Sequence, residues 1–457
     1  MPRHASDDGP HSSRRGRRRL LLGVGASSVV AAALATIALS TVLEPDAPGS
    51  AGATPAAEVP SSPAPSPSPS PTPSPAVFSL VAAGDLLPHN PVVRSATDGD
   101  GAIDFGPLLA ALDPWVQGAD LALCHMEVPV APKGSAPSGY PLFAAPSELV
   151  GDLAEQGWDG CSTASNHSVD RGYDGVRATI RALADAGMGY VGTAESAEER
   201  DEPQLYVLER AERELTVAHL SATYGLNGLP MPADAPWAVD LIDADRLVEQ
   251  ARAARDDGAD VVLVSLHAGV EYTETLTEQQ TDVVEKLAAS TQVDLVIGHH
   301  AHVPQSIDRV GDGPQGDGMW VAYGLGNLLS NQSSACCDVR TSNGVMLSAT
   351  FTQEPEEETV LTDLRWTGTT VDIPAGHRVH ALPDVLDDTG STTLSADDLE
   401  ARQQRVADAV GHAAKQRKSP AEPTGPAPEV LPRQDSAGGS GSTERDTDST
   451  GDTDSTG

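Results

Sequence analysis

The residues best suited to chemistry in this sequence stand at the ends of short apolar runs. Asp85, Glu127 and Asn166 each follow such a run within a residue or two, and so do His267 and the cluster 299–302. Because the carboxyl ends of parallel strands meet at one edge of a sheet, we expect these side chains to lie together there. Carboxylate, amide and imidazole groups are the ligands that divalent cations such as Mn, Fe or Zn prefer. The pattern therefore predicts a metal site, and two metals close together could activate water against a phosphoryl or acyl group.

Each of these residues also has a simpler interpretation. A single Asp after a strand often caps a turn or a helix, and a lone buried His such as His267 often only makes hydrogen bonds. The cluster 299–302 is harder to explain in this way, because three charged imidazoles in four positions would repel one another. Metal binding explains that cluster best.

The elements that must position these residues lie between 77 and 385. Short apolar runs alternate there with amphipathic stretches, which predicts an α/β fold with a largely parallel central sheet. The apolar segments after residue 318 have no helical stretches between them, so one side of the domain should be antiparallel.

Composition excludes one large class of function. The chain has 457 residues with 29 Lys+Arg against 66 Asp+Glu, a formal net charge of −37. Nucleic-acid binding depends on positive charge that neutralises phosphates, so we expect no nucleic-acid partner.

The two ends of the chain differ from the middle in composition. Residues 1–19 form a basic leader containing Arg14 and Arg15, and the uncharged apolar segment 20–43 is long enough to span a membrane. Positive charge stays on the cytoplasmic side, so we expect the main domain outside the cytoplasm, either on a single-pass membrane anchor or secreted after cleavage of a signal peptide. Residues 44–76 are a Pro/Ser/Ala-rich linker, and residues 386–457 are expected to be a mostly disordered acidic tail.

Six motifs in order resemble one known family. They are GDLLPHN, HMEVP, SNHSVDRGYDG, HAGVEY, GHHAHVPQ and YGLGNLL, and they span Phe78 to Leu329. This series is similar to that of the CapA family of poly-γ-glutamate capsule synthesis proteins, within the calcineurin-like metallophosphatase superfamily. The resemblance implies a four-layer α/β/β/α sandwich with a dinuclear metal site.

The resemblance also implies roles for single residues. The implied metal ligands are Asp85, Glu127, Asn166, His267, His300 and His302, with Glu127 in the bridging place. His167 matches the histidine that donates a proton or stabilises the transition state. His89, four residues after Asp85, is a weaker candidate for an additional ligand because the superfamily places that histidine two residues after the aspartate.

Several positions depart from the family pattern. His125-Met126-Glu127 stands in place of Asn-Leu-Glu, and Ser165 replaces the first Asn of Asn-Asn-His. Ala268 and Ala301 replace a common Trp and a common Pro. The implied ligands survive, so the departures concern the residues around them and the shape of the cleft.

Residues beside the motifs have expected roles of their own. Asp170 is interpreted as a helix cap rather than a chemical group, and Asn327 as a group that orients a ligand histidine. Glu271 and Tyr272 either face the substrate or form an ordinary exposed loop. Cys124 and Cys161 are either a disulfide or two buried thiols, and Cys336 and Cys337 lie next to each other in a loop.

Two functions from different classes fit these features. The first is a metal-dependent hydrolase or transferase outside the cytoplasm that acts on a phosphoester or on an amide-linked anionic polymer such as poly-γ-glutamate; a general metallophosphoesterase is a variant of it. The second is a non-catalytic accessory of a membrane complex that makes or exports a capsule polymer. In both cases the expected partners are an anionic polymer or phosphoester, membrane capsule-synthesis subunits, and the membrane itself through the N-terminal helix.

Overall fold

The computed structural model describes residues 74–433. The basic leader, the apolar segment 20–43, most of the linker and the last residues of the acidic tail lie outside this range. Among residues 74–433, no helix is both long enough and apolar enough to cross a membrane.

The first of two sheets contains the first strand of the described chain and most of the strands after residue 326. Its order is β14-β13-β12-β1-β2-β3-β4, with β11 also paired to β1 and β15 to β13. The strands are β1 (Ala76–Leu87), β2 (Leu121–Met126), β3 (Gly160–Ser162), β4 (Gly189–Val191), β11 (Asn327–Ser330), β12 (Asn343–Gln353), β13 (Thr359–Asp372), β14 (Arg378–Ala381) and β15 (Lys415–Gln416). The pairs from β1 to β4 are parallel, whereas β12 to β14 are antiparallel.

The second sheet is built mainly from the middle of the chain, with the last described strand, β16, added at one edge. Its order is β16-β5-β6-β7-β8-β10-β9. The strands are β5 (Gln204–Arg210), β6 (Arg213–Thr223), β7 (Val261–His267), β8 (Leu295–His299), β9 (Ile307–Val310), β10 (Met319–Ala322) and β16 (Glu429–Val430). The pairs from β6 through β8 to β10 are parallel and the outer pairs are antiparallel. The mixed α/β fold predicted from the sequence is confirmed.

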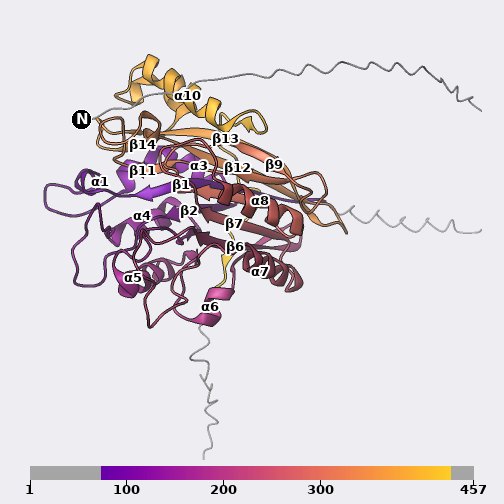
Figure 1. Ribbon diagram of the computed structural model, residues 1–457. Helices are drawn as coiled ribbons and strands as arrows, with labels where there is room; N and C mark the ends of the chain where they lie inside the picture. The colour runs from indigo at the N-terminus through magenta and orange to yellow at the C-terminus, as the bar shows by residue number, and fades with distance from the viewer. Residues whose placement is uncertain (1–73, 434–457) are drawn as a thin grey trace, which may run out of the picture. The chain divides into compact units, whose positions relative to one another are not determined.

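Three hydrophobic clusters order the layers. One lies between the sheets and joins Leu80 and Leu121 of the first to Leu215 and Leu263 of the second. A second packs the other face of the first sheet against helices, and a third does the same for the second sheet. The helices of the first sheet's outer layer include α2 (Gly106–Leu109), α3 (Asp113–Gln117) and α4 (Glu148–Gln156), and those of the second are α7 (Ala244–Asp256) and α8 (Glu278–Ser290). Figure 1 shows α7 and α8 beside β7, and α4 beside β2.

The remaining helices lie at the edges of these layers. They are α1 (Asn90–Ser95), α5 (Gly172–Asp185), α6 (Ala197–Asp201), α9 (Leu382–Asp387) and α10 (Ala396–Val410). Short 3-10 turns follow α2 and precede β12 and α10.

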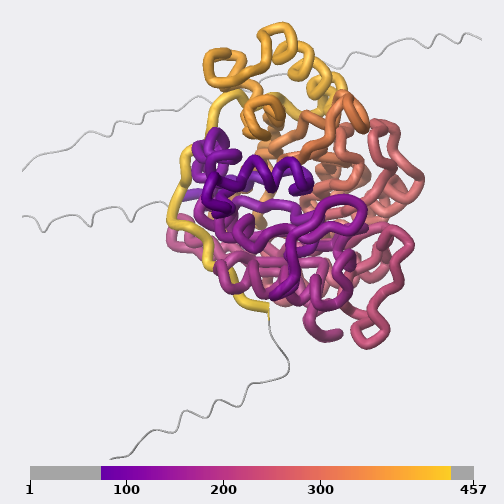
Figure 2. Tube along the Cα trace, turned by 90° about the vertical axis from the view of Figure 1, so that its left-hand side faces the viewer, coloured from indigo at the N-terminus to yellow at the C-terminus, as the bar shows by residue number. Residues whose placement is uncertain are grey.

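Ordered structure continues well past residue 385, where we placed the end of the domain. The helix α10 buries Leu399, Val406 and Val410 against the hydrophobic cluster between the sheets. The chain then forms a strap, residues 415–433, in which β15 pairs with the first sheet and β16 with the second. Figure 2 shows this segment in yellow along one side of the domain. The boundary at 385 was therefore too early, since hydrogen bonds to the rest of the fold order a segment whose Pro-rich composition suggests disorder.

Candidate metal centre

Strand register brings the predicted site residues to one edge of the two sheets. Asp85 of β1 is paired with His125 of β2 and with Asn327 of β11, and His267 of β7 is paired with His299 of β8. Possible ligand atoms then lie within 4.8 Å of one another in three groups: Asp85–His125–His299, Glu127–His267–His300 and Asp85–Glu127–His302. Every residue of these groups is buried.

Two glycines allow this close approach. A Cβ on Gly84 would lie 2.0 Å from the carbonyl oxygen of Gly326, and one on Gly298 would lie 1.9 Å from that of Tyr323. Neither position has room for a side chain, and each directly precedes a site residue. The backbone can therefore carry Asp85 and His299 into contact with the other sheet elements.

The carboxylate of Asp85 is held by the histidine cluster. Its Oδ1 lies 3.2 Å from His299 Nδ1, and its Oδ2 lies 3.2 Å from His302 Nδ1 and accepts from the backbone N–H of His300. Burial alone would raise the pKa of Asp85, but the hydrogen bonds with His299 and His302 outweigh it and hold the pKa well below its ordinary value. Asp85 is thus ionised at neutral pH and available as a ligand.

Glu127 is in a different state. Both of its carboxylate oxygens are buried without a hydrogen-bond partner among the described residues, and its nearest ion-pair contact, to His302 Nε2, is 3.6 Å long. Burial raises the pKa of Glu127 to about 8 despite His302. A buried, unpaired carboxyl group costs free energy, so its position calls for a cation that is not a side chain.

Three of the imidazoles in the cluster favour the neutral form. Burial lowers the pKa of His300 to about 3 and holds those of His125 and His267 well below the ordinary value. The Nδ1 atom of His300 is also buried without a partner among residues 74–433. Neutral imidazole is the form that binds a metal, so this part of the site fits a divalent cation.

Asn166 and His267 are in direct contact. The Asn166 Oδ1 lies 2.8 Å from His267 Nε2, and His267 Nδ1 lies 2.9 Å from His125 Nε2. The structure therefore brings all six predicted ligands into one cluster, and Asn166 joins it through His267.

Two histidines of the possible ligand groups were absent from the predicted ligand set. His125 stacks on His299 with ring centroids 3.9 Å apart, and both share a possible ligand group with Asp85. Their position at strand ends was the available signal, since His125 directly precedes the Met-Glu pair and His299 begins the cluster 299–302.

Asn327 orients a histidine, as predicted. Its Oδ1 lies 3.0 Å from His302 Nδ1, while its Nδ2 donates to the carbonyl of Thr341. These bonds fix the His302 ring with Nε2 directed toward Glu127. Burial lowers the pKa of His302, but the charges of Glu127 and Asp85 outweigh it and raise that pKa to about 9.

His167 is held by a residue whose role we interpreted wrongly. Asp170 Oδ2 lies 2.7 Å from His167 Nδ1 and also accepts from the backbone N–H of Phe143. It does not cap α5, whose N-cap is Arg171. Burial would lower the pKa of His167, but the bond to Asp170 raises it above the ordinary value. His167 therefore favours the protonated form with Nε2 free of Asp170.

The segment after β6 contributes a residue that the motifs did not reveal. Asn227 accepts from Asn166 Nδ2 at 3.1 Å, and its own Nδ2 lies 3.5 Å from His167 Nε2. It has a positive φ of 52°, which asparagine tolerates better than most residues. No family motif covers this position, so only the tertiary structure reveals it.

A cavity of about 700 Å³ opens beside these residues. His167, Asp170 and Asn227 line it together with Glu271 and Tyr272. Of the two alternatives for Glu271 and Tyr272, the structure supports the one in which they face the cavity, not the ordinary exposed loop. His89 also lines the cavity, but its Nδ1 is bonded to the Leu87 carbonyl and it belongs to none of the three ligand groups.

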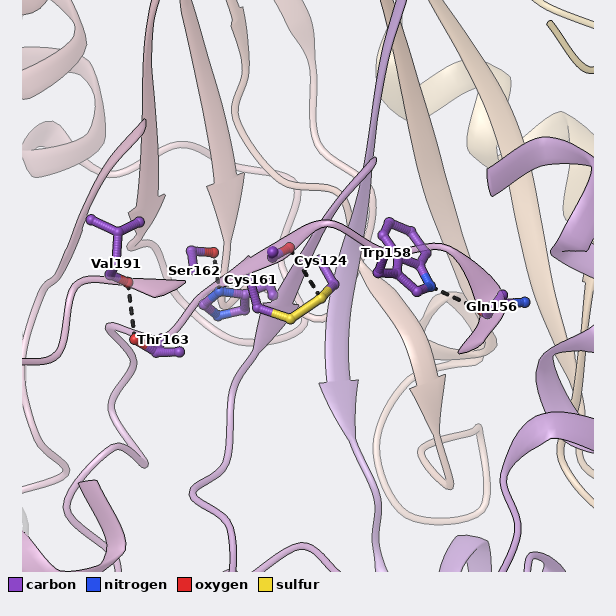
Figure 3. Close-up of a disulfide and its surroundings, with 9 residues drawn as sticks. Cys124, Gln156, Trp158, Cys161, Ser162, Thr163 and Val191 are labelled. Atoms are coloured by element: carbon purple, nitrogen blue, oxygen red, sulfur yellow. Dashed lines mark hydrogen bonds between the residues drawn. A yellow bond between two sulfur atoms is a disulfide. The ribbon is translucent and has the colours of Figure 1, made fainter. Parts of the chain in front are cut away.

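A disulfide braces the strands that carry part of the site. Cys124 of β2 and Cys161 of β3 are register partners and are joined by a disulfide (Figure 3). The next residues, His125 and Ser162, are also paired, and His125 Nδ1 lies 2.8 Å from Ser162 Oγ. Of the two alternatives left open for these cysteines, the disulfide is the one found, whereas Cys336 and Cys337 are free.

Comparison with known proteins identifies the family. Over 194 residues the chain is 28% identical to the capsule biosynthesis protein CapA of Bacillus anthracis, which is 42% of this chain and 44% of the relative. It is 24% identical over 186 residues to the PGA biosynthesis protein CapA of Bacillus subtilis strain 168, 40% of this chain and 46% of that one. The matches thus cover about half the length of these relatives.

A solved structure and a family model were also matched. The calcineurin-like phosphoesterase YfkN from Bacillus subtilis aligns with 73% of this chain and 97% of its own, at a TM-score of 0.41 and 12% identity. The family model described as "Bacterial capsule synthesis protein PGA_cap" matches residues 79–332, more than half of the chain and all six motifs. The resemblance predicted from those motifs is confirmed, and the chain belongs to the bacterial capsule synthesis protein family PGA_cap.

Proposed function

We propose that this protein is a metal-dependent phosphoester hydrolase that acts in the synthesis of a capsule-type polymer, outside the cytoplasm and tethered to the membrane by residues 20–43. The observation that carries the proposal is Glu127, a fully buried carboxyl group whose two oxygens have no hydrogen-bond partner among residues 74–433, although His267 and His300 beside it favour the neutral, metal-binding form. Family membership supports the link to capsule synthesis.

The donor set fits two divalent cations such as Mn, Fe or Zn. Asp85 with His125 and His299 would hold one, and Glu127 with His267 and His300 the other; Asp85 and Glu127 also share a group with His302. When bound, such cations supply Lewis-acid stabilisation of charge on a phosphoryl or acyl oxygen.

The chain's own residues would then position the substrate and move a proton. Asp170 fixes the His167 ring through Nδ1, so Nε2 faces the cavity with a proton to give to a leaving oxygen. Asn227 accepts from Asn166 Nδ2 and so orients the Asn166 side chain.

Metal content and hydrolysis test these roles separately. Residues 74–433 are purified and loaded with Mn²⁺, and bound metal and turnover of p-nitrophenyl phosphate are measured. His300→Asn should lose metal and activity together, whereas His167→Asn should keep the metal and lose at least about 100-fold in kcat. His380→Asn is the matched control, since His380 is also buried but belongs to no ligand group.

Two results would contradict the proposal. Failure of the wild-type protein to bind any divalent cation rejects the metal site. Metal binding without hydrolysis, together with capsule assembly that survives His167→Asn, would favour the accessory, non-catalytic role instead.

A further inference from the structure

Large hydrophobic side chains are exposed at the mouth of the cavity. Tyr140 is 79% exposed and Leu142 42%, and both line the cavity. Val270, 53% exposed, directly precedes the cavity-lining Glu271, and the ring of Tyr224 lies 4.5 Å from that of His300 between centroids. Exposed apolar groups gathered around a cavity indicate that something apolar covers them.

The loop that presents Tyr140 and Leu142 is held in place. Ser138 and Ala144 exchange two backbone hydrogen bonds of 2.9 Å across it. The carbonyl of Leu142 accepts from Ser138 Oγ at 2.7 Å and from Arg171 Nη2 at 2.9 Å. These hydrogen bonds fix the conformation of the loop, so Tyr140 and Leu142 form a defined apolar rim of the cavity.

A buried aromatic ring connects this rim to His167 at the other side of the cavity. The ring of Phe143 lies 6.5 Å from that of Tyr140 and 4.9 Å from that of His167, between centroids. Phe143 is itself buried, so it supports the cavity-lining Tyr140 and His167 from behind and fixes their separation.

Charge in the cavity disfavours a second anionic group on the ligand. The lining contains the carboxylate of Glu271 and no Lys or Arg among the described residues, and the protonated form favoured by His167 is paired with Asp170. The nearby Arg171 is engaged with the rim loop, and Arg340 binds Glu274 and the carbonyl of Tyr272. Beyond the cation site, a further carboxylate or phosphate would meet negative charge without a side-chain partner.

We propose that the cavity binds a phosphomonoester with an apolar alcohol part, which lies over Tyr140 and Leu142. This inference rests on the proposed function and narrows its substrate class. It favours a ligand with one anionic head group over a polyanion such as a γ-linked glutamate oligomer.

Equilibrium binding of two phosphonates tests the inference without turnover. The full-length protein is loaded with Mn²⁺ and titrated calorimetrically with octylphosphonate and with methylphosphonate, neither of which can be hydrolysed as an ester. Octylphosphonate should bind at least about tenfold more tightly than methylphosphonate, because burying a few methylene groups supplies enough free energy for a tenfold difference in Kd.

Substitutions at the rim should remove this preference. Leu142→Ser and Tyr140→Ser should each reduce the octyl-to-methyl ratio to less than about threefold and leave methylphosphonate binding unchanged. Leu241→Ser is the matched control, since Leu241 is also 42% exposed but does not line the cavity.

The outcomes separate this inference from the proposed function. Equal binding of both phosphonates overturns the inference alone, and so does a tri-γ-glutamate that displaces octylphosphonate at equal concentration. Metal-independent binding of octylphosphonate without any binding of methylphosphonate supports the apolar contact and contradicts the metal-dependent function. If neither phosphonate binds, both proposals are wrong.

Discussion

The two ends of strand β2 carry buried carboxylates in opposite circumstances. Asp120 directly precedes the strand, and its oxygens accept from Arg210 Nη2 at 2.8 Å, from the backbone and hydroxyl of Ser79, and from Thr424. Glu127 directly follows the strand, and both of its oxygens are unpartnered within residues 74–433. The same residue class is thus completely satisfied at one end and unsatisfied at the other.

This difference separates a structural carboxylate from a candidate metal ligand. The buried Arg210 compensates the charge of Asp120, so this carboxylate needs no bound ion to be stable in the folded protein. Glu127 lies beside histidines and the carboxylate of Asp85 and has no arginine or hydrogen-bond donor for its own oxygens, so binding of a cation would stabilise its ionised form. Burial of an acidic residue therefore does not identify a metal site; missing side-chain partners do.

The largest effect expected at the structural end comes from Asp120→Ala. The change leaves the buried Arg210 and two backbone N–H groups without their acceptor, so the free energy of unfolding should fall by about 3–5 kcal/mol. Urea unfolding of residues 74–433, followed by circular dichroism, measures it.

A half-exposed ion pair provides the matched control. Asp363 pairs with Arg365 at 2.5 Å with both side chains about two-fifths exposed, so Asp363→Ala should cost no more than about 0.5 kcal/mol. If Asp120→Ala cost no more than this control, the view of Asp120 as a structural anchor would be wrong.

At the other end, Glu127→Gln should change how stability depends on pH. In the metal-free fold the pKa of Glu127 is about 8, above the ordinary value near 4.5, so the folded state holds a proton that the unfolded state releases between these pH values. Wild-type stability should therefore fall as pH rises from about 5 to 8. The pKa of His302, raised to about 9, acts in the same direction above pH 6.5.

The Gln variant should lose most of this slope. At pH 8 in the presence of EDTA, its free energy of unfolding should exceed that of wild type by roughly 1–3 kcal/mol. Mn²⁺ should no longer raise the free energy of unfolding as it does for wild type. Urea unfolding at pH 5, 6.5 and 8 measures both. An identical pH slope in the two proteins would show that Glu127 is already compensated within the fold.

Sequence reasoning predicted the ligand-binding end of β2 better than the structural end. Asp85, Glu127 and His267 could be recognised because strand ends of a parallel sheet converge, which is a rule of topology. Asp120 has no comparable signal, since its partners Arg210 and Thr424 come from distant parts of the chain.

The two wrong predictions, for Asp170 and for the strap 415–433, also arose because the interacting residues are distant in sequence. Asp170 was interpreted as a helix cap because the loop containing Phe143, which packs on His167, could not be placed from local sequence. The strap 415–433 was assigned to the tail because its Pro-rich composition has no periodicity, although distant hydrogen-bond partners order it.

The smallest expected effect concerns this strap. Thr424 Oγ1 donates to the carbonyl of Val77 at 2.6 Å and accepts from Arg210 Nε at 2.8 Å. Thr424→Val removes these bonds but keeps the backbone N–H that donates to Asp120, so the free energy of unfolding should fall by about 1–2 kcal/mol. Thr362→Val, at an exposed strand position, is the control and should cost about 0.5 kcal/mol or less.

Mn²⁺ affinity of Thr424→Val decides whether the two ends of β2 are independent. Thr424 contacts Asp120 and Arg210 but none of the possible metal ligands, so metal affinity should stay within about twofold of wild type. A weaker affinity would mean that the strap transmits strain along β2 to Glu127. The structural end of the strand would then help to set the geometry of the metal centre, and the separation between the two carboxylates would no longer hold.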